Sequence, residues 1–383
     1  MYGSIFSLLG VWIQRMTIGW HAWQLGESAF FVGLIAAVQL LPVIILTPFF
    51  GVLVDRIRPQ TGFMVAIVLM AVVAAILGIV TLQDSMTREI LLSLSLALGF
   101  VVSFYSPARL SLLPDLVPKR MFQSSVAIQS TVFNLSRFVG PALAGFVVAF
   151  WGVGWAYLIN AATYLPVLLS VSLLKIDHAG KPPRKTRPYV EELQEGIQYA
   201  RKHPQIRMAI LISFAAAFFG RGILELLPAF TAIAFQGGSS TLAILMAAAG
   251  LGALVGSIAM STQFLRVRTQ LLIVGGCFCV AIALVAFSLA KNLYAGVAAI
   301  ALLGLASTFV SVGSQTLVQL RVEDRLRGRV VSLWSLVSMG GPAIGSISGG
   351  WLVGDIGPSA TAVAYAAGCL LFVVLVSRGN DKS

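Results

Sequence analysis

The chain has 383 residues, of which 58% are hydrophobic and only 10% are charged. Soluble domains carry about 25% charged residues, so this sequence has too little polar surface to cover a water-soluble globule of its size. The formal net charge of +12 would suit a nucleic-acid partner, but the basic residues lie in the gaps between apolar runs, where they act as a topology signal. The composition therefore excludes a soluble or nucleic-acid-binding protein and favours one embedded in a lipid bilayer.

Twelve apolar runs follow one another along the chain, and a helix needs roughly 20 such residues to cross a bilayer. The first run lacks the basic n-region and the small-residue cleavage site of a signal peptide, so we expect it to be the first spanning helix. The expected fold class is an all-α membrane protein with twelve transmembrane helices. The expected spans are 3–25, 31–54, 61–83, 89–113, 121–150, 153–174, 205–235, 239–263, 268–290, 293–318, 327–354 and 358–378.

The second half of the chain restates the first. Gly140-Pro141-Ala142 is echoed by Gly341-Pro342-Ala343, and the stretch 112–120 is echoed by 317–325. Two homologous six-helix halves with pseudo-two-fold symmetry are typical of secondary transporters. We expect an N-terminal six-helix half over residues 1–174, a cytoplasmic linker over 175–204 and a C-terminal six-helix half over 205–383.

The basic residues predict the orientation. Of the 26 lysines and arginines, 21 fall on the side of the two termini, three lie in spans, and only Arg88 and Lys291 fall on the opposite side. Cytoplasmic loops are enriched in Lys and Arg, so both termini are expected in the cytoplasm of a bacterial inner membrane. Within the linker, Val190, Leu193 and Ile197 recur at helical spacing, which predicts a short amphipathic helix on the inner membrane face. A binding site for a regulatory partner is the alternative for this segment.

The loop after the second span reads Gly51-Val52-Leu53-Val54-Asp55-Arg56-Ile57-Arg58. It resembles the loop signature of the major facilitator superfamily, in which a Gly and an Asp-Arg pair precede further basic residues. An Asp here can cap a neighbouring helix N-terminus or pair with a basic side chain. The resemblance implies a cytoplasmic latch, although Pro59-Gln60-Thr61 departs from the pattern. The latch residues are Gly51, Asp55, Arg56, Arg58 and Arg109.

A finer resemblance covers nearly the whole chain. Ser106-Pro107-Ala108-Arg109, the stretch 134–142 and Arg327-Gly328-Arg329-Val330 are similar to the branch of this superfamily that contains the bacterial enterobactin exporter. The resemblance implies proton-driven export of siderophores, and in some members of drugs such as macrolides. Val11 stands where related chains often carry Asp, so the resemblance assigns no proton or cation role to that position.

Four ionisable groups lie deep within predicted spans: Arg15, Arg137, Arg221 and Glu225. A charge at the bilayer centre costs from roughly 2.5 kcal/mol upward, so such groups usually face a cavity and serve function. Arg221 and Glu225 are four residues apart and can pair, which makes a purely structural ion pair the alternative. Because the first, fifth and seventh spans lie near the central cavity in this superfamily, the resemblance implies that the three arginines line it. A net intramembrane charge of about +2 favours an anionic or oxygen-rich ligand.

Polar side chains within the spans complete the predicted site. Glu225 is the expected proton carrier, and His21, nearer the outer end of the first span, is the second candidate. Four amides offer hydrogen bonds, although packing between helices explains each of them singly as well. The predicted substrate-binding residues are Gln14, Arg15, Gln39, Asn134, Arg137, Arg221 and Gln315.

The sequence contains no phosphate-binding loop, metal-binding motif or nucleophile motif. We therefore predict no enzyme, no cofactor and no metal. The predicted function is a monomeric exporter that uses alternating access to move an amphipathic anionic or siderophore-like small molecule against protons. One alternative is a broad multidrug or macrolide efflux antiporter, which an excess of intramembrane acids would favour. A second is a channel or non-transporting membrane sensor, against which the repeat and the latch loop argue.

Overall fold

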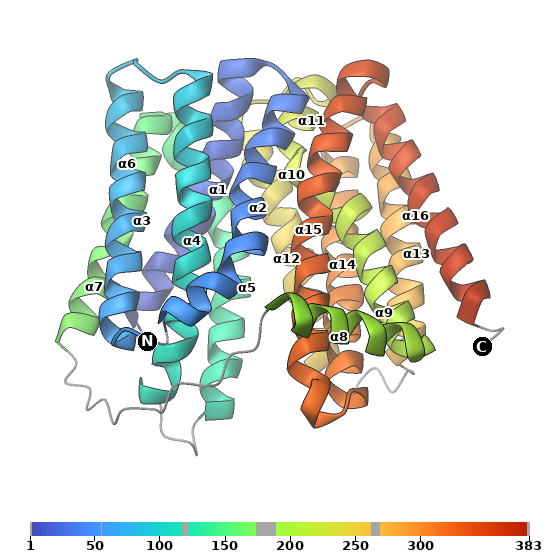
Figure 1. The fold of residues 1–383 in the computed structure, drawn as a ribbon. Coiled ribbons are helices and arrows are strands. Elements are labelled where there is room, and N and C mark those ends of the chain that lie inside the picture. The colour runs from blue at the N-terminus through green and yellow to red at the C-terminus, as the bar shows by residue number, and fades with distance from the viewer. Residues whose placement is uncertain (1, 55, 117–121, 174–188, 262–268, 381–383) are drawn as a thin grey trace. The chain divides into compact units, whose positions relative to one another are not determined.

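A computed structural model describes residues 2–54, 56–116, 122–173, 189–261 and 269–380. These described residues form helices and short connections and contain no strand (Figure 1). In hydrocarbon no water is available to bond the backbone, and a helix satisfies its own N–H and C=O groups. The helices are α1 (Tyr2–Gly26), α2 (Ala29–Val54), α3 (Pro59–Leu82), α4 (Arg88–Leu116), α5 (Phe122–Trp151), α6 (Val153–Thr163), α7 (Leu165–Ser172), α8 (Tyr189–Lys202), α9 (Pro204–Ala215), the π-helical turn η2 (Ala216–Arg221), α10 (Gly222–Glu225), α11 (Leu227–Ala234), α12 (Ser239–Ser261), α13 (Thr269–Ser288), α14 (Leu293–Arg321), α15 (Asp324–Ile356) and α16 (Pro358–Asn380).

Eleven helical segments of the described chain are long and apolar enough to cross a membrane. The remaining span, α1, has 25 residues, and its mean hydropathy is lowered by Gln14, Arg15 and His21. Two spans are interrupted: α6 and α7 together form the sixth, and α9, η2, α10 and α11 together form the seventh. The expected twelve spans are confirmed, and every described end lies within three residues of its expected position.

Short turns separate the spans, and several of them contain a residue with a positive φ angle. Glu27, Asp84 and Gly357 have positive φ angles of 45°, 53° and 81°. This left-handed region reverses the chain in few residues and is easiest for glycine. Asn292 caps α14, since its side-chain oxygen accepts a hydrogen bond from the Ala295 amide at 2.9 Å.

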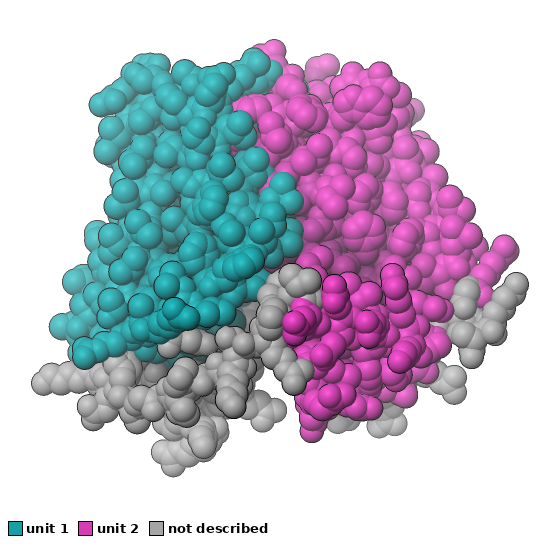
Figure 2. Space-filling view, viewed as in Figure 1, with its two compact units in different colours: residues 1–26, 38–186 teal, residues 27–37, 187–383 magenta. Residues whose placement is uncertain are grey.

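The helices gather into two compact units, which Figure 2 colours separately. Unit 1 comprises residues 1–26 and 38–186, and unit 2 comprises residues 27–37 and 187–383. Residues 27–37, which the sequence analysis assigns to the N-terminal half, thus cluster with the C-terminal helices. Ser346 of α15 donates from its hydroxyl to the Gly33 carbonyl at 3.0 Å, which ties this segment to unit 2. The division of the chain at residue 174 stays a prediction.

In unit 1, α3 packs against α4 and α6, and α1 packs against α5, α6 and α7. Phe63, Ile67 and Met70 of α3 are buried there together with Leu112 of α4 and Tyr164. Since lipid tails are as apolar as these side chains, close packing rather than exclusion of water holds the helices together. These contacts determine which polar residues of α1 face α5 and which face α6.

In unit 2, α14 packs against α12 and α13, and α15 packs against η2 and α16. Small residues line these contacts: a Cβ at Gly252 would overlap the Ala301 carbonyl, and one at Gly304 would overlap the Ala249 carbonyl. Glycine permits such close backbone approach between helices in a membrane. The packing against η2 positions Arg221, the arginine predicted for the seventh span.

The linker helix α8 packs against α15 and α9. Figure 1 shows it crossing the spanning helices of unit 2 rather than running along them. Glu195 forms an ion pair with Arg329 of α15, and a Cβ at Gly196 would lie 3.1 Å from the Arg329 carbonyl oxygen. The helix expected over 190–202 is present, and α15 covers part of one of its faces.

Candidate functional site

Two arginines of unit 1 lie over the same indole ring. The guanidinium carbon of Arg15 is 5.6 Å from the centroid of Trp12, and that of Arg137 is 5.7 Å from it. The negative face of an aromatic ring attracts a cation within about 6 Å. Trp12 therefore offsets part of the repulsion between two like charges, and α1 and α5 present them together.

The backbone of α5 makes this arrangement possible. A Cβ at Gly140 would overlap the Cβ of Trp12, so only glycine lets α5 approach α1 this closely. Phe133 packs edge-on against Trp12, with ring centroids 5.7 Å apart. The indole nitrogen of Trp12 is buried and has no hydrogen-bond partner among the described residues. Two guanidiniums and one unused N–H make a cluster of donors that suits oxygen acceptors.

Gln14 and His21 lie on the α6-facing side of α1 and not beside this cluster. The Gln14 side-chain oxygen accepts a hydrogen bond from the Asn160 amide, and Gln14 is only 3% exposed. Nδ1 of His21 lies 3.3 Å from the hydroxyl of Tyr157, and both side chains are buried. These pairs join α1 to α6 through buried polar groups, which are costly in a membrane unless bonded.

The other amides predicted for unit 1 take separate positions. Asn134 is half-buried on α5, one turn before Arg137, so the two side chains share a helix face. Gln39 is half-buried on α2, where a Cβ at Gly99 of α4 would lie 2.9 Å from its carbonyl oxygen. The structure thus brings Asn134 toward the arginine cluster and places Gln39 at the contact between α2 and α4.

Among the predicted latch residues, one bonds to another helix and two are exposed. Arg109 of α4 donates to the side-chain oxygen of Gln129 of α5 at 2.8 Å. Arg56 and Arg58 are exposed, and a Cβ at Gly51 would meet no atom of the described residues within 4 Å. Asp55 lies outside the described residues. Arg109 therefore connects α4 to α5.

In unit 2, the seventh span changes its helical geometry at the predicted charges. Arg221 ends the π-helical turn η2, and Glu225 ends α10 four residues later. The Arg221 Nη1 donates to the Ser338 carbonyl oxygen of α15 at 3.1 Å. Both charged side chains are half-buried. Single π turns inside α-helices occur frequently at functional sites.

A buried polar network in unit 2 escaped the sequence analysis. The Ser213 hydroxyl donates to the Ser314 hydroxyl at 2.7 Å and accepts from the Trp334 indole at 3.1 Å. It joins α9, α14 and α15 next to Gln315, which is half-buried on α14. Serines are common in membrane helices as packing residues, so nothing in the sequence distinguished these two. Tyr157 escaped as well, although a tyrosine inside an apolar span is a signal of a buried polar partner.

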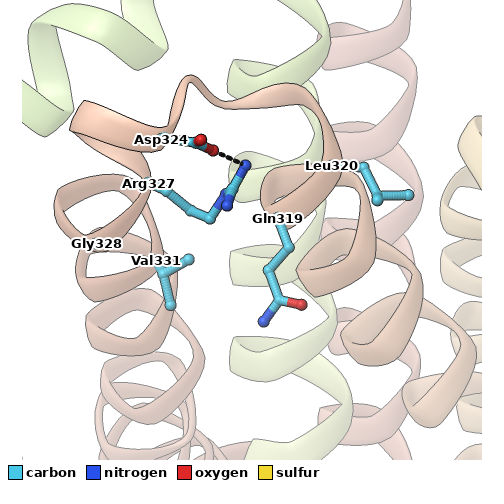
Figure 3. A pocket seen from close by; sticks show the side chains of 6 residues that line it. All are labelled: Gln319, Leu320, Asp324, Arg327, Gly328 and Val331. Atoms are coloured by element: carbon cyan, nitrogen blue, oxygen red, sulfur yellow. Dashed lines mark ion pairs between the residues drawn. The ribbon is translucent and has the colours of Figure 1, made fainter.

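An open hollow lies where α14 ends and α15 begins (Figure 3). Arg327 and Asp324 form an ion pair of 2.5 Å across one turn, and both side chains are exposed. Such a surface pair contributes about 0–1 kcal/mol. The lining residues include none of the predicted substrate residues, and they are Gln319, Leu320, Asp324, Arg327, Gly328 and Val331.

The helix order and the two six-span halves define a transporter of the major facilitator fold. A solved bacterial homologue of the human lysosomal transporter Spinster, in an inward-facing and occupied conformation, matches with a TM-score of 0.75 at 16% identity, over 98% of this chain and 95% of the other. The sequence matches the transmembrane secretion effector family over residues 2–380. The chain therefore belongs to that family of major facilitator transporters, which are not enzymes. The predicted superfamily and fold are confirmed.

Curated relatives with named substrates are similar over most of the chain. The staphyloferrin A transporter of Staphylococcus aureus is 24% identical over 86% of this chain and 83% of its own length. The enterobactin exporter EntS of Escherichia coli is 27% identical over 98% of this chain and 87% of its own length. The macrolide efflux protein A of Streptococcus pyogenes is 23% identical over 89% of this chain and 85% of its own length. The chain is thus a multi-pass membrane transporter with siderophore and macrolide transporters among its relatives.

Proposed function

We propose that this transporter is a monomeric secondary active exporter of an amphipathic anionic small molecule of the siderophore class. It works by alternating access in the bacterial inner membrane. The observation that carries the proposal is the pair of arginines over Trp12. A planar guanidinium binds two oxygens side by side, which suits carboxylate and catecholate groups. The relatives named for staphyloferrin A and enterobactin support the same ligand class.

The charge balance of the spans also favours an anion. Arg15, Arg137 and Arg221 contribute +3 and Glu225 contributes −1, which leaves +2. A lipophilic cation would be repelled by this excess, whereas an anion would be attracted. Asn134, Gln39 and Gln315 are proposed as further polar contacts. Gln14 is proposed to hold α1 against α6 through its bond to Asn160.

Transport into inverted membrane vesicles tests the substrate class. Arg15→Gln and Arg137→Gln should each lower the affinity for enterobactin about 10- to 150-fold, because a hydrogen bond to a charged group contributes about 1.5–3 kcal/mol. Arg88→Gln is the matched control, since Arg88 is exposed at the far end of α4. The proposal is wrong if both variants accumulate enterobactin normally and instead lose uptake of a lipophilic cation.

Proton coupling is assigned to Glu225, an acid that lies within the seventh span, at the end of α10. Arg221 lies four residues before it and is proposed to pair with it until a substrate competes for the arginine. Glu225→Gln should abolish uptake driven by a proton gradient while ligand binding persists. If the gradient still drives accumulation, His21, buried beside Tyr157, takes the role.

The latch role is assigned to Gly51, Asp55, Arg56, Arg58 and Arg109. Asp55→Asn should leave the protein folded and inserted but slow transport, because it removes a charge contact that biases two conformations. Unchanged kinetics at equal protein level would remove Asp55 from this role.

Both termini are proposed to lie in the cytoplasm. A cysteine replacing Gly238 should react with an impermeant thiol reagent in intact cells, and a cysteine replacing Pro183 should not. Cys279 is only partly buried and is replaced first, so that labelling reports the introduced thiol. Labelling of a cysteine at position 183 in intact cells would show that the proposed orientation is wrong.

Macrolide efflux is the second candidate, and the similarity to macrolide efflux protein A favours it. The two functions differ in the charge that the ligand brings to the arginines. A macrolide exporter should confer erythromycin resistance that survives Arg15→Gln, whereas a siderophore exporter should lose enterobactin secretion in the same variant.

A further inference from the structure

A proline in the middle of α15 leaves one backbone carbonyl without its helical donor. In an α-helix the N–H of residue i donates to the carbonyl of residue i−4, and proline has no N–H. Pro342 therefore releases the carbonyl of Ser338. Ser338 is only 9% exposed, and a buried carbonyl without a donor is costly. A side chain from another helix can supply the missing hydrogen bond.

Arg221 supplies it from the seventh span. Its Nη1 donates to the Ser338 carbonyl oxygen at 3.1 Å, across the contact between η2 and α15. A guanidinium has five N–H donors, so one bond to a carbonyl leaves others for a second acceptor. Arg221 can therefore bond both the Ser338 carbonyl of α15 and an anion, but bidentate binding to an anion changes the direction in which the guanidinium points.

Close packing holds the two elements together at this point. A Cβ at Gly341 would lie 2.9 Å from the Phe218 amide nitrogen, and one at Gly345 would overlap the Phe218 carbonyl. Phe218 also stacks on Tyr365 of α16, with ring centroids 5.7 Å apart. The Tyr365 hydroxyl donates to the Gly345 carbonyl at 2.6 Å. The turn η2 therefore packs closely against the segment of α15 that contains Pro342, and this contact keeps Arg221 beside the Ser338 carbonyl.

We propose that Arg221 is a positioning residue that caps the Ser338 carbonyl released by Pro342, and that an anionic ligand competes with this carbonyl for the guanidinium. When the anion binds the Arg221 guanidinium, the Ser338 carbonyl loses its hydrogen bond. The present conformation of α15 is then less stable, which favours a different one. The charge of the ligand is coupled in this way to a spanning helix. The competition rests on the proposed anion transport, whereas the cap is a property of the folded chain alone.

A double-mutant cycle in the purified full-length protein tests the cap. Arg221→Met removes the donor at similar volume, and Pro342→Ala restores the N–H of residue 342. Arg221→Met should lower the apparent melting temperature, and the loss should shrink to about half or less in the Pro342→Ala background, because contacting residues couple. Pro141→Ala is the matched control, since Pro141 is the equivalent residue of the other half. It should leave the effect of Arg221→Met unchanged.

Ligand binding separates a positioning role from a merely structural one. Pro342→Ala should bind 2,3-dihydroxybenzoate about 10-fold tighter than the parent, because the anion no longer has to strip a buried carbonyl of its donor. Binding of tetraphenylphosphonium should not tighten. Additive melting temperatures in the cycle, or unchanged or weaker binding of the anion by Pro342→Ala, overturn the proposal. Because these are measurements of stability and binding, failure of vesicle transport alone would reject the exporter function and leave the cap standing.

Discussion

Replacing Trp12 tests whether the indole organises the two arginines of unit 1. Their guanidinium carbons lie 5.6 and 5.7 Å from the ring centroid, near the outer limit of about 6 Å for this interaction. Each contact therefore contributes at the lower end of the range, about 0.5–1 kcal/mol, and the pair about 1–2 kcal/mol. Loss of both should weaken anion binding about 5- to 30-fold. This estimate applies to Trp12→Leu, which removes the aromatic face but keeps an apolar side chain.

The assay is equilibrium binding of enterobactin to the purified transporter, followed by uptake into inverted vesicles. Trp12→Phe keeps an aromatic face but loses the indole N–H, so it should retain more affinity than Trp12→Leu and less than the parent. Trp155→Leu is the control, since Trp155 of α6 is 49% exposed and is not a proposed site residue. Trp12 does not organise the two arginines if Trp12→Leu binds enterobactin normally, or if Trp12→Phe loses as much affinity as Trp12→Leu.

Three further substitutions probe the packing that positions the site. Gly10→Leu should destabilise the protein by about 1–3 kcal/mol, since a Cβ at Gly10 would overlap the side chain of Asn160; an unchanged melting temperature would contradict the α1–α6 contact. Ser213→Ala should cost about 1–3 kcal/mol by leaving the buried Trp334 N–H without an acceptor, and indole fluorescence should report the change. Glu195→Gln should lower stability by less than about 1 kcal/mol, because its pair with Arg329 is partly exposed. A larger loss would show that α8 does more than rest against α15.

Much of the fold follows from the sequence because the bilayer constrains it from outside. Hydrocarbon thickness sets the length of a span, and every unbonded backbone group in it is costly. The apolar runs therefore place each described helix end within three residues of its position in the structure. The repeat of Gly140-Pro141 as Gly341-Pro342 likewise predicts two related halves before any coordinates are known.

The partners of the polar residues depend on the tertiary structure. Gln14 and Arg15 are neighbours in sequence, but successive residues of a helix point about 100° apart. One of them therefore meets α6 and Asn160, and the other lies over Trp12 with an arginine from α5. Their positions on the first span were predictable, whereas the helix packed against each face was not.

Arg221 shows the same division most clearly. The sequence by itself determined that an arginine lies in the seventh span and that Pro342 deprives Ser338 of a donor, since both follow from apolar length and from the i−4 pattern of a helix. Only the tertiary structure decided that the Arg221 Nη1 lies 3.1 Å from the Ser338 carbonyl oxygen. The physical reason is that a π turn and the glycines at 341 and 345 bring two backbones into contact, and such close approach depends on how helices pack rather than on what each helix contains.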